Sequence, residues 1–309
     1  MSRTSVVRLG LLALLWGSSF LWIELALRAF SPVQIVFVRL ALGAAVLVSI
    51  ALAAGLGFPR GWRTWAHLAV AAMFANAAPY LLFGIGQQSV ASNIAGMLNA
   101  TTPLWAVTLA FATRADPYLT WRRAAGIPAG MAGVLLIFSP WQTVGQVATW
   151  GALACLAAAA CYGLSYVYMG RFLTGRGVPP LMLSASQLTA ATILLAAAMP
   201  VAGVSPVTWR LDAGVSLLVL GGACTGAAYV LLYRLITDEG ATAASTVTYL
   251  LPVVAVALGW LVLREPVTTT RAIGTVLVLA GVALAQRRPS GTTRSPGRRP
   301  GPESRIPPP

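Results

Sequence analysis

Charged side chains are scarce in this sequence. Only 9% of its 309 residues are charged and 58% are hydrophobic, whereas a soluble domain carries about 25% charged residues. Apolar runs of roughly 20 residues, the length of a helix that crosses a bilayer, recur along the whole chain. The composition therefore excludes an ordinary soluble domain and indicates a polytopic membrane protein.

Residues for metal or disulfide chemistry are almost missing. His67 is the single histidine, and its position near Trp65 is typical of a residue at the level of the lipid headgroups. The three cysteines lie inside apolar runs and form no C-x-x-C pair; they are Cys155, Cys161 and Cys224. We therefore expect no metal site, no disulfide framework and no cofactor.

Lysine is absent, and so is the G-x-x-x-x-G-K-[ST] loop that binds the phosphates of ATP. This absence argues against ATP as a direct energy source. The net charge of +14 comes from arginine, and a basic balance of this kind can indicate nucleic-acid binding. The arginines lie between the apolar runs and in the C-terminal tail, so we expect the lipid bilayer as a partner and no nucleic acid.

Ten apolar segments are predicted to cross the membrane. Each should be helical, because hydrocarbon offers no partner to a free backbone N–H or C=O group. The first resembles a signal peptide, but its apolar run is too long and no A-x-A site follows, so we interpret it as an uncleaved span. The predicted spans are Leu9–Ala29, Pro32–Ala53, Trp65–Gly86, Ser92–Thr113, Ala124–Phe138, Thr149–Met169, Pro180–Val201, Leu211–Ile236, Ala241–Leu263 and Ala272–Gln286.

The arginines predict the orientation of these spans. With the N-terminus inside, most arginines between the spans fall in cytoplasmic segments, as the positive-inside rule requires. Both termini are then cytoplasmic. Residues 287–309 are rich in Pro, Gly and Arg and are predicted to form a disordered tail. We favour a solvated tail without a role, and contact of its arginines with anionic lipid is the alternative.

An internal repeat organises the chain. In each copy an apolar helix with a proline precedes an acid-Pro pair and a helix with two glycines. Five spans are an odd number, so the second copy enters the membrane from the opposite side, as in many secondary carriers. An offset of 149 places Pro103 on Pro252, Asp116 on Glu265 and Pro117 on Pro266, and an offset of 148 places Gly126 on Gly274 and Gly133 on Gly281.

These patterns predict an all-α integral membrane fold of ten helices in two inverted five-helix repeats. The predicted divisions are a cytoplasmic N-terminus at 1–8, a first repeat at 9–138, a linker at 139–148, a second repeat at 149–286 and the tail at 287–309.

Several of these residues together resemble EamA-type proteins of the drug/metabolite transporter superfamily. They are the stretch Trp16-Gly17-Ser18-Ser19-Phe20, then Pro32, Arg39, Pro103 and Glu265-Pro266 before a G-x6-G helix. The resemblance covers roughly residues 8–288. It implies a bacterial inner-membrane carrier, a class in which many members export amino acids or other small metabolites. It does not identify the substrate, and the first half departs from the second by having Asp116 in place of Glu.

Polar side chains in hydrocarbon are costly and mark transport pathways or helix contacts. Asn76, Tyr80, Phe83 and Gln87 recur at the spacing of one helix face. A central cavity lined by such faces is one interpretation, and small or polar residues that join helices are the other. We favour the second for Ser and Thr and leave both open for Asn and Tyr. The cavity candidates are Trp16, Ser19, Asn76, Tyr80, Asn99, Thr102, Tyr162, Ser165, Tyr229, Thr246 and Tyr249.

Two charged residues, Glu24 and Arg39, lie inside predicted spans at similar depths from the outer side. One hypothesis is that Glu24 takes a proton during coupling, or that Arg39 binds a substrate carboxylate. We favour the other, in which the two form a structural ion pair or each reaches the outer surface with its long side chain.

The prolines and glycines have structural interpretations. An acid followed by proline is a helix-start signal, which predicts such a role for Asp116-Pro117 and Glu265-Pro266. Pro103 and Pro252 are predicted helix breaks. The glycine pairs of the two repeats permit close helix packing, and contact between two copies in a homodimer is the alternative.

We expect a multi-pass secondary transporter of the plasma membrane that exports small amphipathic metabolites, such as amino acids or related compounds, by alternating access. An uptake carrier for sugars, nucleotides or other metabolites is the alternative, although phosphate-bearing substrates call for several basic residues. A membrane-embedded enzyme is a remote alternative, because no two carboxylates share a predicted span and we expect no catalytic residues. Proton coupling, exchange and facilitated diffusion stay open.

Overall fold

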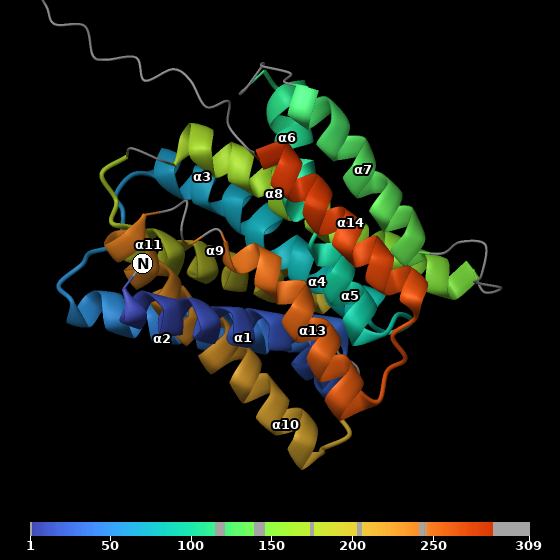
Figure 1. Cartoon of the computed structure of the whole chain (residues 1–309). Coiled ribbons are helices and arrows are strands. Elements are labelled where there is room, and N and C mark those ends of the chain that lie inside the picture. The colour runs from blue at the N-terminus through green and yellow to red at the C-terminus, as the bar shows by residue number, and fades with distance from the viewer. Residues whose placement is uncertain are drawn as a thin grey trace, which may run out of the picture.

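The computed structural model describes residues 2–114, 121–138, 146–173, 176–202, 206–240, 244 and 246–286. These residues form a bundle of helices, and no strand occurs among them (Figure 1). The all-helical prediction is confirmed for this part of the chain. The predicted linker, the Asp116-Pro117 pair and the tail lie wholly or mostly outside the described residues.

The helices follow one another with short connections. Two segments each contain a wider π-helical stretch, η1 or η2, that joins two α-helices into one continuous helix. The elements are α1 Arg3–Ala26, α2 Pro32–Ala53, α3 Trp62–Ala72, η1 Met73–Ala77, α4 Ala78–Gly86, α5 Ser92–Asn99, α6 Thr102–Ala112, α7 Trp121–Phe138, α8 Gln146–Phe172, α9 Pro180–Ala202, α10 Leu211–Leu218, η2 Val219–Ala227, α11 Ala228–Glu239, α13 Val247–Leu263 and α14 Thr269–Gln286.

Within the part of the chain that the structure describes, seven helical segments are long and apolar enough to cross a membrane. They are Arg3–Ala26, Pro32–Ala53, Trp62–Gly86, Ser92–Ala112, Trp150–Phe172, Pro180–Pro200 and Leu211–Glu239. Three shorter apolar helices, Ala124–Ile137, Val247–Leu263 and Thr269–Ala285, fall on the other predicted spans. These findings support a multi-pass membrane protein, while the crossing of all ten segments and the inverted relation of the halves stay predictions.

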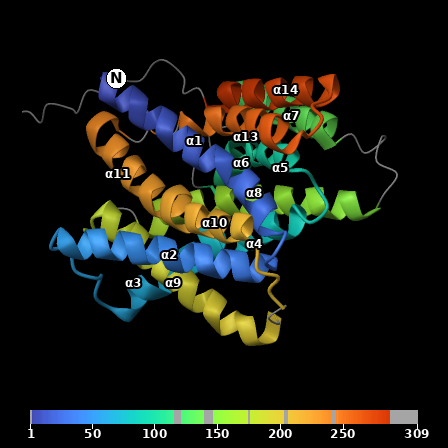
Figure 2. The same ribbon diagram turned by 90° about the horizontal axis from the view of Figure 1, so that it is seen from below.

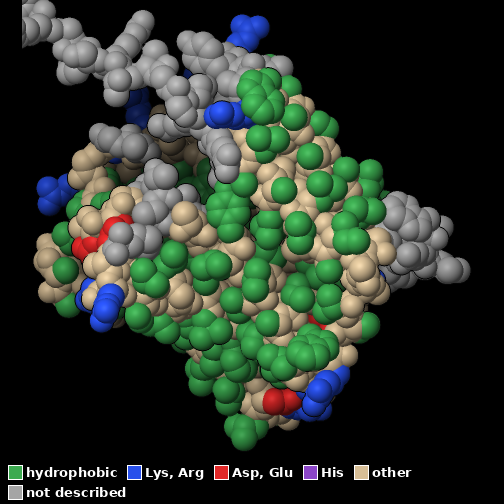
Figure 3. Space-filling model, in the orientation of Figure 1, with side chains coloured by type: hydrophobic (Ala, Val, Ile, Leu, Met, Phe, Trp, Pro, Cys, Tyr) green, Lys and Arg blue, Asp and Glu red, His purple; other side chains and the backbone are tan. Residues whose placement is uncertain are grey.

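The surface agrees with a membrane environment. Hydrophobic side chains cover the middle of the visible face, and charged side chains gather near its margins (Figure 3). Three exposed tryptophans lie at or near helix starts, where rings of this kind can anchor a protein at the membrane interface. Trp62 begins α3, Trp121 begins α7 and Trp209 precedes α10, and all three are more than half exposed.

Local sequence signals account for the start of α2. The Ser31 side chain accepts a hydrogen bond from the backbone N–H of Gln34, and the Gln34 side chain accepts one from the N–H of Ser31 at 2.8 Å. Pro32, which has no N–H to leave unsatisfied, takes the first helical position. The start of this segment is therefore as predicted.

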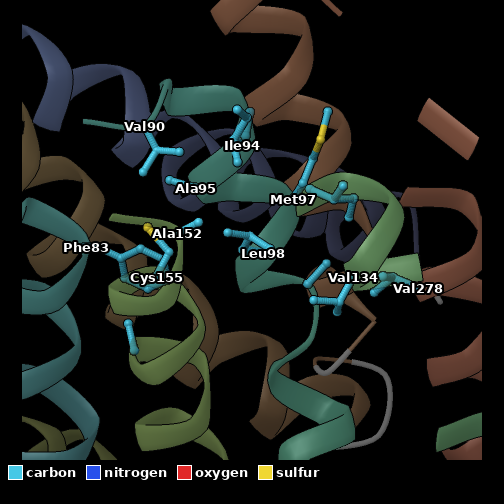
Figure 4. Packing of buried hydrophobic residues seen from close by; sticks show 14 of the residues in the cluster. Phe83, Val90, Ile94, Ala95, Met97, Leu98, Val134, Ala152, Cys155 and Val278 are labelled. Atoms are coloured by element: carbon cyan, nitrogen blue, oxygen red, sulfur yellow. The ribbon is translucent and has the colours of Figure 1, made fainter. Parts of the chain in front are cut away.

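The largest apolar cluster of the described residues joins segments from both ends of the chain. Phe83 of α4 and Leu98 of α5 pack in it with Cys155 of α8 and Val278 of α14 (Figure 4). Cys155 is a free thiol. Segments far apart in sequence therefore share one core, which holds α4, α5 and α8 in place around the centre of the bundle.

α7 and α14 pack with their backbones in contact, and the two helices lie side by side in both views (Figures 1 and 2). A Cβ atom added to Gly133 would lie 2.6 Å from the carbonyl oxygen of Gly274, and one added to Gly126 would lie 2.7 Å from that of Gly281. The glycines therefore serve close packing within one chain. A homodimer stays a prediction, but these glycine faces are already covered.

Pro103 and Pro252 differ in their effect on the helix. The Ser92–Ala112 segment is interrupted at Ala100 and Thr101, and Pro103 is the second residue of the new helix. α13 runs without interruption through Pro252, so the predicted break there is wrong. The reason is position, because α13 starts only five residues earlier, and the missing N–H of Pro252 affects just its second turn.

Glu265 caps a different helix from the one predicted. Its carboxylate accepts hydrogen bonds from the backbone N–H groups of Ser92 and Asn93 at 2.8 and 2.9 Å, and from the Ser92 hydroxyl at 3.0 Å. It therefore caps α5 and not α14, whose first residue is Thr269. The predicted structural role holds, but sequence proximity pointed to the wrong helix, since α5 lies more than 160 residues away along the chain.

Gly133→Ala should destabilise the protein by about 1–3 kcal/mol, because the added methyl group overlaps backbone atoms of α14 that cannot move aside. Gly10→Ala is the matched control: it also lies in a helix, but an added Cβ there meets nothing within 4 Å. The thermal unfolding midpoint in detergent measures both. Equal midpoints for the two variants would contradict the close contact of α7 and α14.

Candidate functional site

A cavity of about 360 Å³ lies in the centre of the bundle. Its volume is at the lower end of the range of small-molecule pockets, about 300–1,000 Å³. Helices from both halves of the chain line it, and most of the lining is apolar or aromatic. Such a cavity suits one small molecule with a substantial apolar part.

Most of the predicted cavity residues lie in this wall. They are Trp16, Ser19, Tyr80, Asn99, Thr102, Tyr162, Ser165 and Tyr229. The structure thus brings together residues from α1, α4, α5, α6, α8 and α11. Their contact with a substrate stays a prediction.

Tyr249 and Thr246 do not line the cavity. Tyr249 packs against the large apolar cluster that contains Phe83 and Leu98, and Thr246 is exposed just before the first residue of α13. The prediction placed both on a cavity-facing stripe of a longer helix. Because α13 begins only at Val247, that stripe is shorter, and Thr248 is the residue from this turn that reaches the cavity. Thr242 and Ser245 are outside the described residues.

Asn76 lies behind the cavity wall and supports it. The side chain is fully buried, and its Oδ1 accepts a hydrogen bond of 2.6 Å from Nε2 of Gln187. Its Nδ2 donates to the hydroxyl of Tyr229 at 3.3 Å. Gln187 and Tyr229 both line the cavity. Asn76 therefore holds two lining side chains, from α9 and α11, in fixed positions.

Arg39 is the one charged residue among the described residues that line the cavity. Its side chain is only 5% exposed, and its Nε donates to the Thr225 hydroxyl at 3.0 Å. The guanidinium carbon lies 3.9 Å from the centre of the Tyr80 ring, within the range of a cation–π contact. Its side chain thus turns toward the centre of the bundle.

The predicted pair of Glu24 and Arg39 does not form. Across the described ranges, no carboxylate lies within ion-pair distance of Arg39, and Arg39 does not reach the outer surface. The two residues have similar depth but lie on helix faces that point to different neighbours. Arg39 turns toward Tyr80 and Thr225, whereas Glu24 lies beside Gln87 and near Glu265.

A π-helical segment positions Thr225 for Arg39. In η2 the Thr225 hydroxyl donates to the carbonyl of Leu220, five residues earlier, at 2.8 Å, while it accepts the hydrogen bond from Arg39. Gly43 of α2 leaves room for this approach, because a Cβ atom there would lie 2.6 Å from the Thr225 methyl group. Wide turns of this kind occur often at functional sites.

Aromatic rings form the apolar part of the wall. Tyr80 and Tyr162 meet edge to face with ring centres 6.5 Å apart, and Trp16 and Tyr229 do so at 6.2 Å. Phe83 lies 6.2 Å from Tyr162. Edge-to-face pairs of this kind are favourable and hold the rings in place. The cavity therefore presents rigid aromatic edges and faces around the guanidinium of Arg39.

Gln187 and Ser184 are among the lining residues that the prediction missed. The signal was present, since both are polar and lie three residues apart in the predicted span Pro180–Val201. A polar side chain within a span is itself a marker of a pathway or a helix contact. The hydrogen bond of Gln187 to Asn76 could only be seen in the structure.

The cavity reaches toward the end of the bundle at which the chain begins. Arg8 near the start of α1 forms an ion pair with Asp238 near the end of α11. The start of α1 and the end of α11 therefore lie at the same end of the bundle. Leu232 of α11 lines the cavity, as do Met169 and Pro180, which flank the α8–α9 connection. At the opposite end Glu24 does not line the cavity, whereas its neighbour Ile23 does.

Both halves of the chain match one family of known proteins. The model of the EamA-like transporter family matches residues 5–139 and again residues 149–286. An uncharacterized transporter of Archaeoglobus fulgidus is 27% identical over 92% of this chain and 97% of its own length. The uncharacterized inner membrane transporter YedA of Escherichia coli is 27% identical over 80% of this chain and 79% of its own.

A crystal structure of a protein with 22% sequence identity has a similar fold. Its TM-score is 0.65, and the match covers 92% of this chain and 98% of that one. At this identity the likeness concerns the fold alone.

Asn76→Leu should lower the thermal unfolding midpoint, because Gln187 and Tyr229 would each lose a buried partner, at a cost of about 1–3 kcal/mol for an unsatisfied group. Thr113→Val is the control, since it also removes a side-chain hydrogen bond, but at an exposed position. Light-scattering or fluorescence melting of the purified variants measures the difference. If Asn76→Leu has the same thermal unfolding midpoint as the unchanged protein, Asn76 does not support the wall.

Proposed function

The chain belongs to the EamA-like transporter family, and from this premise we propose that it exports small amphipathic metabolites that carry a carboxylate, such as amino acids or related compounds. Its relatives are named transporters and its helices are those of a multi-pass membrane protein, so it is a membrane transporter. The substrate class and the direction of transport are the proposed part.

One observation carries the choice of substrate, namely the buried guanidinium of Arg39 at the cavity wall without a carboxylate partner among the described residues. A buried charge is costly unless it is paired. A substrate carboxylate would supply the missing partner, and guanidinium and carboxylate groups form strong paired hydrogen bonds. The hypothesis that Arg39 binds a carboxylate thus replaces our preferred structural interpretation.

The rest of the lining supports a substrate that also has an apolar part. Tyr80, Tyr162, Tyr229 and Trp16 present aromatic surface to an apolar side chain. The same rings could attract an ammonium group through their faces. A zwitterion of amino-acid size would match the single arginine, the aromatic wall and the volume of the cavity.

Alternating access would use two halves of related structure. The family model matches the chain twice, once on each proposed half. The π-helical segments η1 and η2 also occupy corresponding places, because Asn76 and Thr225 are 149 residues apart and each lies in one of them. Five spans in each half would make the second half inverted, an arrangement common in carriers with a central site.

A carrier for phosphate-bearing substrates such as nucleotides is the second candidate. Such substrates call for several basic groups, whereas Arg39 is the single basic residue in the lining that the structure describes. An enzyme would need an acid or a nucleophile beside a base in the cavity, and no carboxylate occurs in the described lining. A phosphate group could also pair with Arg39, but this one guanidinium would leave most of its charge unbalanced.

The function can be tested in a bacterial host that lacks its own exporters. Cells that express the protein are challenged with toxic amino-acid analogues, dipeptides and cationic dyes, and the intracellular amount of each compound is followed. We expect lower accumulation of amino-acid analogues. Higher accumulation would indicate uptake, and selective protection against the cationic dyes would contradict the carboxylate-bearing class.

Arg39→Gln should lower transport of a carboxylate substrate about tenfold to hundredfold, because a hydrogen bond to a charged group contributes about 1.5–3 kcal/mol. Glutamine retains a polar group that can reach Thr225 but has no charge. Transport of the matching carboxamide, which lacks the negative charge, should stay nearly unchanged. Initial rates in proteoliposomes measure both.

Arg63→Ala is the control for that experiment, since Arg63 is an exposed arginine on α3. An equal loss of acid and amide transport by Arg39→Gln at normal expression would mean that Arg39 supports the cavity and does not recognise the carboxylate.

A further inference from the structure

A second group of polar residues lies outside the cavity, at the end of the bundle opposite the start of α1. It consists of Glu24 near the end of α1, Gln87 after α4, Asn93 in α5 and Glu265 in the α13–α14 connection. Gln87 and Glu265 are the polar and acidic neighbours that act on the Glu24 carboxyl. Glu265 also binds the backbone N–H of Asn93. We call these four residues the acidic cluster.

The acidic cluster has more acceptors than hydrogens to share. Oε2 of Glu24, Oε1 of Gln87 and Oδ1 of Asn93 are buried atoms without a hydrogen-bond partner. Gln87 is 3% exposed and Asn93 is fully buried. Buried acceptors in proteins are nearly always satisfied, so these three orphan oxygens call for an explanation.

A rotated amide group does not remove the problem. Nε2 of Gln87 donates to the carbonyl oxygen of Phe20 at 2.7 Å. Exchange of its oxygen and nitrogen would set Oε1 against that carbonyl, so the neighbour fixes the orientation of this amide. Asn93 is held in the same sense, because its Nδ2 points to the carbonyl of Pro266 at 3.5 Å.

The charged groups around the cluster are already engaged. Both oxygens of Glu265 accept hydrogen bonds from the start of α5. Arg28, which follows α1 and is the cation that acts on Glu24, forms an ion pair with Asp212 of α10 at 3.4 Å, and Arg210 binds the same carboxylate. An ionised Glu24 would therefore face a second carboxylate and leave its own Oε2 without a donor.

We propose that the acidic cluster is a proton-binding site in which Glu24 takes up one proton and, as the neutral acid, donates a hydrogen bond to the orphan oxygen of Gln87. The carboxylate and a proton from water form the neutral acid, and the proton returns to water when the site opens. This one hydrogen supplies the missing donor and also removes the repulsion between the two carboxylates.

The position of the site connects the proton to the cavity. Ile23 lines the cavity next to Glu24, and Phe20, whose carbonyl binds Gln87, lines it one turn earlier. A neutral Glu24 holds α1 against α4 and α5 at this end, whereas the ionised residue repels Glu265 and weakens the closure. This consequence rests on the proposed transport function, but binding of the proton itself does not.

Infrared difference spectroscopy of the full-length protein in liposomes tests the site without any substrate. A step between about pH 8 and about pH 5 should produce the carbonyl band of a protonated, buried carboxylic acid. Glu24→Gln should remove that band, and Asp238→Asn, which changes an exposed carboxylate at the other end, should not. Gln87→Met should shift the frequency of the band, which provides a second readout if Glu24→Gln folds poorly.

Absence of the band, or a band that persists in Glu24→Gln, would overturn the proposal. Stabilisation of the unchanged protein by sodium at constant pH, lost in Glu24→Gln, would overturn it as well, because the oxygens would then bind an alkali cation.

With the compound class from the export screen, Glu24→Gln should retain exchange but lose accumulation driven by a pH gradient. A failed screen would contradict the proposed function and leave the infrared result standing.

Discussion

The cost of an unpaired polar group in hydrocarbon is the constraint on which this structure depends. It requires the backbone to be helical, and it also favours hydrogen bonds between the few polar side chains across the bundle. Asn76 binds Gln187 and Tyr229, Arg39 binds Thr225, and Glu265 binds the start of α5. Each of these contacts joins segments more than 100 residues apart. In an otherwise apolar protein such contacts determine which helix faces meet.

The cavity is a consequence of that arrangement. Its aromatic wall can be rigid because buried amides and hydroxyls behind the wall hold the rings and the Gln187 side chain in place. The guanidinium of Arg39 is the exception, since its Nε has a partner but no carboxylate balances its charge within the described ranges. An unbalanced charge in a central cavity is what a transporter for a charged substrate would need. A structural ion pair would have removed it.

The second exception lies at the end of the bundle, where the acidic cluster has acceptors but too few donors. The two exceptions have opposite character, since one lacks an anion and the other lacks a hydrogen. α1 contributes to both, because Phe20 and Ile23 line the cavity while the Phe20 carbonyl and Glu24 meet the cluster. A single helix thus connects the substrate cavity with the proton site that we propose.

Sequence alone determined the helical, membrane-embedded class, because composition and apolar run length depend only on local hydrophobicity. Most of the cavity residues that it predicted also lie in the wall, since polar residues in apolar helices are rare enough to stand out. Tertiary structure decided which way each side chain turns: Arg39 toward Thr225, Glu24 toward Gln87, and Glu265 onto α5. Helical periodicity places a residue on a face, but the neighbour of that face depends on how distant helices pack. The α7–α14 contact shows the same limit, because its glycines predicted a close approach and only the fold identified the partner.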